Sequence, residues 1–177
     1  LICMGGVGTG KTHLVIALGL KAALSGKEVR FFQTVDLANR LLEKNAKGTL
    51  GSFTRDLESC DLLIVDELGF LPLHRHAAEL LFQVIANCYE RRSVAITTNL
   101  EFGQWNTVIN DNRLTAALID RLVHHGHVLA FTGESYRLRN ALSQLWLTNP
   151  VPKLRCLEVY PGVRSPVAAA QYLSGTE

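Results

Sequence analysis

The sequence predicts an α/β fold in which a parallel sheet is flanked by helices and carries a phosphate-binding loop after its first strand. Three observations predict it. Residues 5–12, Gly-Gly-Val-Gly-Thr-Gly-Lys-Thr, match the pattern Gly, four residues, then Gly-Lys-Ser/Thr. Short apolar runs alternate with helical patterns, which is typical of a parallel sheet covered on both faces. One apolar run, residues 62–65, ends in two acids, Asp66 and Glu67.

The first part of the chain alternates strands and helices. Residues 1–4 have the character of the end of a buried strand, and residues 13–24 are apolar on nearly every face, as a helix packed under a sheet should be. Residues 29–33 predict a second strand. Thr34 is expected to cap the next helix, which runs to about Lys44.

The alternation continues to about residue 147. The pattern predicts a short helix over residues 52–59, a buried strand over 60–65, a helix over 77–89 and a strand over 94–98. A loop rich in Gly, Asn and Asp follows over 99–112, then a helix over 114–124, a strand over 128–131 and a helical or turn segment over 135–147. From Thr148 onward, four prolines interrupt a stretch without periodicity. We therefore expect a core over residues 1–147 and an irregular tail over 148–177.

Composition narrows the class of protein. With 177 residues, 47% of them hydrophobic and 19% charged, the chain is expected to form one globular core. The net charge of +2 is too small to indicate nucleic-acid binding by itself. Four scattered cysteines fit a reduced cytoplasmic compartment, and no apolar run reaches the roughly 18 residues of a membrane span. The chain opens inside its first expected strand, so we expect a fragment that lacks a lead-in.

The phosphate-loop pattern predicts binding of a nucleoside triphosphate. Glycines let the backbone wrap around phosphate oxygens, and the next helix directs its positive dipole end at the anion. Lys11 supplies a charge for the β- and γ-phosphates, and the Thr12 hydroxyl is suited to bound Mg²⁺. His13 is expected to be a helix residue behind the loop rather than a catalyst.

Acidic and amide side chains follow two of the apolar strands. An NTPase needs one carboxylate to hold hydrated Mg²⁺ and a second to polarise the attacking water. Asp66 suits the metal role and Glu67 the water role. Asn99 follows the next strand and is expected at the same carboxyl edge of the sheet, where its amide can bond the γ-phosphate or the water. The alternative for Asn99 is a residue chosen for the turn that follows.

Arg121 has two equally weighted interpretations from the residues alone. It either pairs with Asp120 or solvent on its helix, or reaches the γ-phosphate of a neighbouring subunit as an arginine finger. His124, His125 and His127 resemble metal ligands, but their spacing lacks companion cysteines or carboxylates, so a metal site is not expected there.

Six motifs together resemble the IstB family of insertion-sequence ATP-binding proteins, which is close to the DnaC helicase loaders among the AAA+ ATPases. The motifs occupy residues 5–14, 66–70, 89–93, 97–100, 114–122 and 132–137. The resemblance covers residues 1 to about 140 and implies an AAA+ core of the ASCE type, without an obvious counterpart of the small helical lid.

The resemblance also implies roles for individual residues. Lys11 and Thr12 take the Walker A roles, Asp66 and Glu67 the Walker B roles, Asn99 the sensor role, and Arg121 that of a finger acting in trans. Arg137 matches a motif near the family's C-terminal end that approaches the nucleotide. The residues expected to contact ATP are therefore Gly5, Gly6, Val7, Gly8, Thr9, Gly10, Lys11, Thr12, His13, Asp66 and Arg137, with Thr12 and Asp66 also at Mg²⁺.

The function that the resemblance implies is that of a transposition helper. Such a protein binds ATP and Mg²⁺, hydrolyses ATP, assembles on double-stranded DNA as a homo-oligomer without sequence preference, and hands target DNA to a transposase. A DnaC-type helicase loader and a truncated nucleotide-binding remnant without activity are the alternatives. Arg40, Lys44, Lys47 and Arg55 form either a phosphate-contacting patch or, more commonly for such clusters, a solvated face.

Overall fold

The computed structural model describes residues 1–148, with side chains through residue 143. Leu1–Leu138 form one compact unit, and helix α7 (Tyr136–Thr148) is described by itself. The unit contains a five-stranded parallel sheet in the order β2-β3-β4-β1-β5. Its strands are β1 (Ile2–Gly5), β2 (Val29–Gln33), β3 (Leu62–Leu68), β4 (Ser93–Thr98) and β5 (Val128–Phe131). The predicted fold class, a parallel sheet flanked by helices, is confirmed.

Helices connect the strands at nearly all the predicted places. They are α1 (Lys11–Leu24), α2 (Thr34–Ala46), α3 (Leu50–Ser59), α4 (Arg75–Cys88), the 3₁₀ helix η1 (Phe102–Gln104), α5 (Asn106–Ile109) and α6 (Asn112–His124). The prediction of a loop over residues 99–112 was wrong in part, because η1 and α5 lie within it. Trp105, between them, is only 1% exposed and anchors the segment in the core, a tertiary contact that local composition does not reveal.

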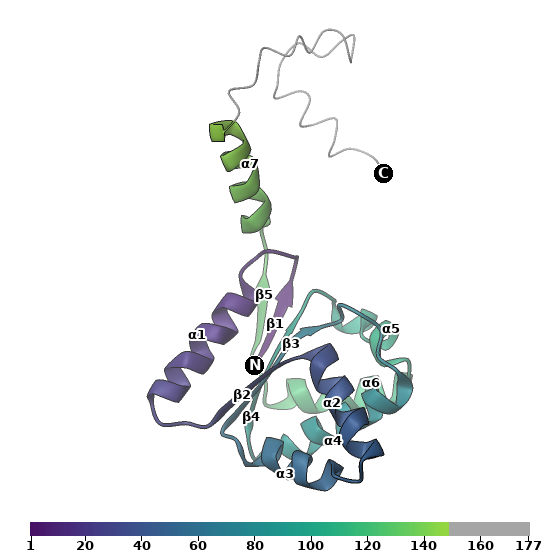
Figure 1. Ribbon diagram of the computed structural model, residues 1–177. Coiled ribbons are helices and arrows are strands. Elements are labelled where there is room, and N and C mark those ends of the chain that lie inside the picture. The colour runs from purple at the N-terminus through teal and green to yellow at the C-terminus, as the bar shows by residue number, and fades with distance from the viewer. Residues whose placement is uncertain (149–177) are drawn as a thin grey trace. The chain divides into compact units, whose positions relative to one another are not determined.

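The two faces of the sheet carry different cores. Figure 1 shows α1 on one side of the sheet and α2, α3, α4 and α6 on the other. Along β3 the buried side chains alternate, with Leu63 and Val65 in the large cluster under the four helices and Leu62 and Ile64 in a small cluster under α1. This alternation follows from the two-residue period of a strand.

Helix α1 packs under the sheet, as its apolar sequence predicted, but it buries only Val15 and Gly19, and at Gly19 an added Cβ would lie 2.8 Å from Ile64 Cδ1. Ala22 is partly buried, whereas the large apolar side chains of α1 apart from Val15 are exposed, Leu24 to 81%. The expectation that Thr34 caps α2 was wrong, because Gln33 holds the extended cap position and Thr34 is the first helical residue. Its hydroxyl is committed elsewhere, to the Asp66 carbonyl oxygen 2.8 Å away.

Because all five strands run the same way, the sheet has a carboxyl edge, where the strands end, and an amino edge, where they begin. The loop after β1 and the residues that end β3 and β4 lie at the carboxyl edge. Helices α4 and α6 run back across the sheet, so their C-terminal ends lie at the amino edge, next to the start of β4 and β5. Ligands of open α/β sheets bind at the carboxyl edge.

Candidate nucleotide site

The phosphate loop joins β1 to α1 at the carboxyl edge. Gly10 caps α1 in a left-handed conformation with φ of 98°, and no side chain within the described part of the chain caps this helix start. The N–H groups of the first helical turn, which includes Lys11, Thr12 and His13, therefore point toward the loop without intrahelical acceptors. The ammonium of Lys11 donates to the carbonyl oxygens of Gly5 and Gly6 at 2.7 and 2.6 Å. The loop thus presents donors and a cation, which suits an anion.

Other loop residues shape the backbone or face solvent. The Thr9 hydroxyl donates to the Gly6 carbonyl oxygen at 2.8 Å, which closes the loop on itself. Val7 is 65% exposed at the loop, and the side chain of His13 is exposed as well. Any contact of Val7 or His13 with nucleotide would therefore come through the backbone or from the exposed face of the loop.

The segment after β5 packs directly on the loop. The Tyr136 N–H donates to the Gly8 carbonyl oxygen at 3.0 Å, and an added Cβ at Gly8, where φ is +78°, would lie 2.1 Å from Ser135 Oγ. Only glycine fits there. Burial lowers the pKa of Lys11 below its ordinary value, Asp66 opposes the shift, and nearby Arg137 adds to it. Arg137 is thus brought to the loop from the far end of the unit.

Asp66 is the buried carboxylate of the site. It is 2% exposed, and its Oδ1 accepts hydrogen bonds from the hydroxyls of Thr12, at 3.0 Å, and Thr97. Thr34 holds its backbone carbonyl. The Thr12 hydroxyl and the Asp66 carboxylate are hard oxygen donors in direct contact, so they fit the ligand chemistry of Mg²⁺.

Glu67 follows Asp66 at an irregular point of β3. Glu67 has φ of 59°, and the pairing of β3 with β4 shifts between Val65 and Leu68. Its N–H donates to Thr97 Oγ1 at 2.9 Å, and its side chain is exposed. A non-glycine residue in this left-handed conformation costs about 1–3 kcal/mol and is typical of functional sites. One carboxylate is therefore buried, and the next one is exposed.

Asn99 reaches the same edge from β4. Its side chain is exposed, and its Oδ1 lies 3.4 Å from the position a Cβ would take at Gly69, two residues after Glu67. The structure therefore places five of the expected residues at one edge of the sheet: Lys11, Thr12, Asp66, Glu67 and Asn99. Their roles in chemistry remain proposals.

Sequence reasoning missed Thr97 and Thr34 as members of this site. Thr97 bonds both acids, donating to Asp66 and accepting from the Glu67 N–H. The signal was present, since Thr97 and Thr98 end the strand next to the acidic one. Which threonine faces Asp66 depends on the shifted register of β3 and β4, which the sequence does not reveal.

Arg121 does not join this site. Its guanidinium carbon lies 4.8 Å from the centre of the Phe82 ring, and its buried Nη1 has no hydrogen-bond partner within residues 1–143. It lines a cavity of about 370 Å³ at the amino edge, together with Leu1, Val94 and His127 at the beginnings of strands. Arg121 therefore lies across the sheet from its own phosphate loop.

The side chains of three of the four basic residues considered for DNA contact have partners on the protein. Arg40 lies over the Phe32 ring at 5.4 Å, Lys47 pairs with Glu43, and Arg55 Nε donates to the Gly51 carbonyl oxygen at 2.9 Å. These contacts favour the interpretation as a solvated face. Separately, none of the helices described within residues 1–148 is long and apolar enough to span a membrane.

Comparison with known proteins identifies relatives over most of the chain. The family model for IstB-like ATP binding proteins matches residues 1–144. The ATP-binding protein of insertion sequence IS5376 from Geobacillus stearothermophilus is 40% identical over 139 residues, 78% of this chain and 55% of that protein. The corresponding protein of IS21 from Pseudomonas aeruginosa is 39% identical over 78% of this chain and 52% of its own length. The chain spans about half the length of the curated relatives it matches.

Solved structures show the same fold. The DnaC helicase loader has a TM-score of 0.66 at 24% identity, over 75% of this chain and 77% of that one. AMPPCP-bound DnaA from Aquifex aeolicus has a TM-score of 0.65 at 23% identity, over 83% of this chain and 45% of that one. At these identities the likeness concerns the fold alone, and it confirms the expected AAA+ type of phosphate-loop fold.

Proposed function

The chain belongs to the IstB-like ATP-binding protein family, and we propose that it is a Mg²⁺-dependent ATPase that assists transposition by delivering target DNA to a transposase. The observation that carries the proposal is the meeting of Lys11, Thr12, Asp66 and Glu67 at the carboxyl edge, where Thr12 contacts Asp66 at 3.0 Å. These four residues provide a phosphate cation, two hard oxygens and an exposed carboxylate.

The phosphate loop and the start of α1 bind the phosphates of ATP. The N–H groups of the first helical turn and the loop donate to phosphate oxygens, and Lys11 exchanges its two carbonyl acceptors for the β- and γ-phosphates. The lowered pKa of Lys11 comes mainly from burial, and the phosphate charge favours the protonated form that binding needs. Arg137, carried to the loop by the contact of Tyr136 with Gly8, adds a second cation.

Thr12 and Asp66 would hold Mg²⁺, which, when bound, neutralises charge that develops on the phosphates during transfer. Thr97 and Thr34 keep Asp66 in place from two sides. Thr97 donates to the carboxylate and Thr34 to the backbone carbonyl oxygen of Asp66, so the residue is held before any ligand arrives, which lowers the reorganisation that binding requires.

Glu67 acts on the water that attacks the γ-phosphorus. Its exposed carboxylate accepts the water proton as the new P–O bond forms and the bond to the ADP oxygen breaks. Asn99, beside Gly69, orients that water or the γ-phosphate through its amide. The left-handed backbone of Glu67 keeps its carboxylate away from buried Asp66, so one acid serves the metal and the other the proton.

Arg121 completes the site of a neighbouring subunit in a homo-oligomer. It lies at the amino edge, across the sheet from its own loop, so it cannot serve the nucleotide that its own chain binds. An arginine with a fixed charge suits stabilisation of the transferring phosphoryl group in trans. The active assembly therefore needs at least two subunits, with double-stranded DNA as the scaffold on which they gather.

The relatives favour a transposase over a helicase as partner. Sequence relatives at 36–40% identity are insertion-sequence proteins, whereas the likeness to the DnaC helicase loader at 24% identity concerns the fold. The experiment measures ATP turnover at rising protein concentration, with and without random-sequence duplex DNA. It also measures binding to an integrase-type transposase and to a replicative helicase.

We expect turnover that rises with concentration and with DNA, together with selective binding to the transposase. Selective binding to the helicase would instead favour a loader. Nucleotide binding without turnover under every condition would identify an inactive remnant.

A further inference from the structure

A histidine and glutamate cluster lies at the amino edge, outside the nucleotide site. It consists of Glu90, His124 and His125, whose possible ligand atoms all lie within 4.8 Å of one another. His125 Nε2 is 3.1 Å from Glu90 Oε1. In the described part of the chain it is the only group of three histidine, cysteine or acidic side chains so placed. The spacing of the histidines shows no companion cysteine or carboxylate nearby in the sequence, but Glu90, 35 residues before His125, supplies a carboxylate in the fold.

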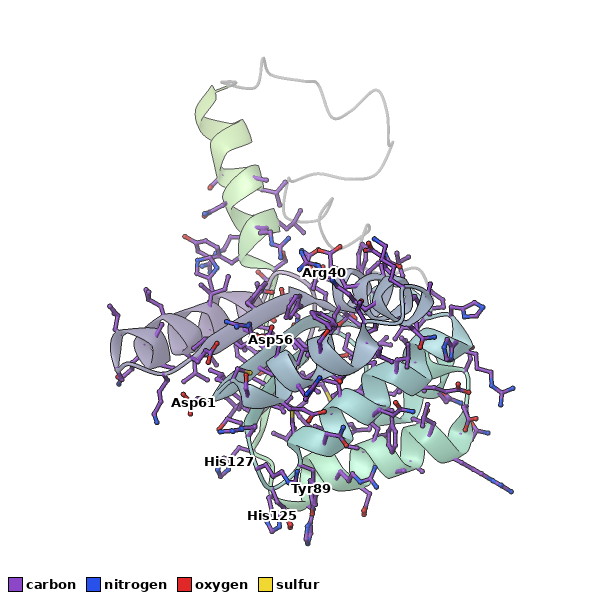
Figure 2. The ribbon with its side chains drawn as sticks, turned by 60° about the horizontal axis from the view of Figure 1, so that its bottom comes forward. Arg40, Asp56, Asp61, Tyr89, His125 and His127 are labelled. Atoms are coloured by element: carbon purple, nitrogen blue, oxygen red, sulfur yellow. The ribbon has the colours of Figure 1, made fainter. Side chains whose placement is uncertain are left out.

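Two helix ends bring the cluster together. Helix α4 ends at Cys88, and the turn that follows places Glu90 in a left-handed conformation with φ of 57°. Helix α6 ends at His124. The turn is held by the N–H groups of Arg91 and Arg92, which donate to the Cys88 carbonyl oxygen at 3.1 and 2.8 Å. Figure 2 shows Tyr89, His125 and His127 at the same end of the molecule.

A further side chain orients the first histidine. Tyr89 Oη lies 2.6 Å from His124 Nδ1, and the Tyr89 ring stacks on both neighbouring imidazoles. A hydrogen bond to one imidazole nitrogen fixes the ring and its tautomer and leaves the other nitrogen for a ligand bond. In protein metal sites, a histidine ligand commonly makes such a hydrogen bond through the nitrogen that does not bind the metal.

We propose that Glu90, His124 and His125 bind one Zn²⁺ ion or a similar late transition-metal ion. Two imidazoles and one carboxylate suit Zn²⁺ better than Mg²⁺, which prefers oxygen. In tetrahedral Zn²⁺ with bonds of about 2.0–2.1 Å, ligand atoms lie about 3.3 Å apart, close to the 3.1 Å between His125 Nε2 and Glu90 Oε1. The side chains are exposed, so rotation about their χ angles closes the remaining gap to the third ligand, and water takes the fourth position.

The bound ion would tie the end of α4 to the end of α6. Arg121 lies one helical turn before His124, and its guanidinium rests on Phe82 of α4. The tie would therefore hold the two helices that position Arg121. This consequence for Arg121 rests on the proposed function, whereas metal binding itself does not, so the two can fail separately.

The test is a titration of the untagged, metal-free chain with Co²⁺ followed by absorption, and with Zn²⁺ by competition, without nucleotide. We expect one ion per chain and a rise in the unfolding temperature with added Zn²⁺. Glu90→Gln, His124→Ala and His125→Ala should each weaken binding about tenfold or more. His76→Ala is the matched control, because His76 pairs with Glu79 at 3.3 Å outside the cluster.

Three further variants test whether binding of the ion depends on these three residues alone. His127→Ala should leave the affinity unchanged, since His127 lies outside the three-residue group. Asp66→Asn should also leave it unchanged, which separates this site from the nucleotide site. Tyr89→Phe should weaken binding by less than removal of a ligand. The proposal is overturned if no stoichiometric binding is found, or if binding survives both Glu90→Gln and His125→Ala.

Discussion

The carboxyl and amino edges of the same sheet are built in different ways. At the carboxyl edge, Lys11 begins the helix after the phosphate loop, Asp66 lies near the end of β3 and Asn99 directly follows β4. They share this edge because parallel strands end together. At the amino edge, Arg121 and the cluster of Glu90, His124 and His125 come from the ends of helices that return across the sheet. One edge is interlocked by hydrogen bonds around a buried acid, whereas the other carries an exposed cluster and the partly buried Arg121 beside a cavity of about 370 Å³.

The carboxyl edge thus gathers its groups within one chain, whereas the role proposed for Arg121 requires a second chain. The interlocked threonines around Asp66 indicate a preorganised centre. The buried, unpartnered Nη1 of Arg121 indicates a group whose hydrogen-bonding capacity is not used within residues 1–143. Substitutions at the carboxyl edge should therefore affect the nucleotide site at any protein concentration. Substitution of Arg121 at the amino edge should affect ATP turnover only where subunits assemble.

The largest expected effect at the carboxyl edge is on turnover. Glu67→Gln should bind ATP as the parent does and hydrolyse it at least about a hundredfold more slowly, because the amide cannot accept the water proton. Single-turnover hydrolysis with radiolabelled ATP measures it. Glu79→Gln, a surface glutamate paired with Arg75, is the control. Unchanged turnover would remove Glu67 from the mechanism and with it the separation of the two acids.

The second largest effect is expected on ATP binding when the loop lysine is removed. Lys11→Ala removes a charged donor to the phosphates and should weaken ATP binding about tenfold to a hundredfold. Equilibrium binding of a fluorescent ATP analogue measures it. Lys27→Ala is the matched control, because Lys27 is an exposed lysine whose partner, Asp61, precedes β3 at the amino edge. Equal binding by both variants would show that the carboxyl edge is not the phosphate site.

A smaller effect is expected from Thr97→Val, which keeps the shape but removes the hydroxyl between the acids. Asp66 loses a donor and the Glu67 N–H loses its acceptor, so the free energy of unfolding should fall by about 1–3 kcal/mol and turnover should decrease. Urea unfolding and steady-state hydrolysis measure the two effects. Thr115→Val, which removes a buried hydroxyl bonded to Asp111, should cost stability but leave turnover unchanged. Equal turnover in both variants would contradict the preorganised centre.

The smallest expected effect concerns Cys88, which lines the amino-edge cavity. Burial, with Cys60 and Glu58 adding to it, raises the pKa of Cys88 to about 11. The unfolded thiol ionises nearer its ordinary pKa, so the stability that the neutral thiol contributes is present below about pH 9 and is lost as the pH rises toward 11. Urea unfolding at pH 8 and pH 10.5 should show this loss, and Cys88→Ala should reduce it. An identical alkaline loss in Cys88→Ala would contradict it.

The sequence predicted the carboxyl edge far better than the amino edge. The positions of Lys11, Thr12, Asp66 and Asn99 at this edge could be predicted because they depend only on strand order and direction, whereas the roles of these residues stay predictions. Thr97 was missed because its contact with Asp66 depends on a register shift at Glu67. The nearness of Glu90 to His125 was missed because it depends on how α4 and α6 pack, a tertiary relation without a local pattern. The outward apolar face of α1 was missed for the same reason.

In the proposed assembly, a complete site joins the carboxyl edge of one subunit to the amino edge of another. The most direct test mixes Arg121→Ala with Glu67→Gln and measures ATP turnover, with sedimentation to establish that mixed oligomers form. Neither variant alone contains an interface with both groups intact, but a mixed oligomer pairs Glu67 of one subunit with Arg121 of the other. We predict that mixing restores part of the parent activity, while Arg121→Ala mixed with Arg121→Ala,Glu67→Gln restores none. No recovery in established mixed oligomers, or parent-like turnover by Arg121→Ala alone, would contradict the proposed assembly.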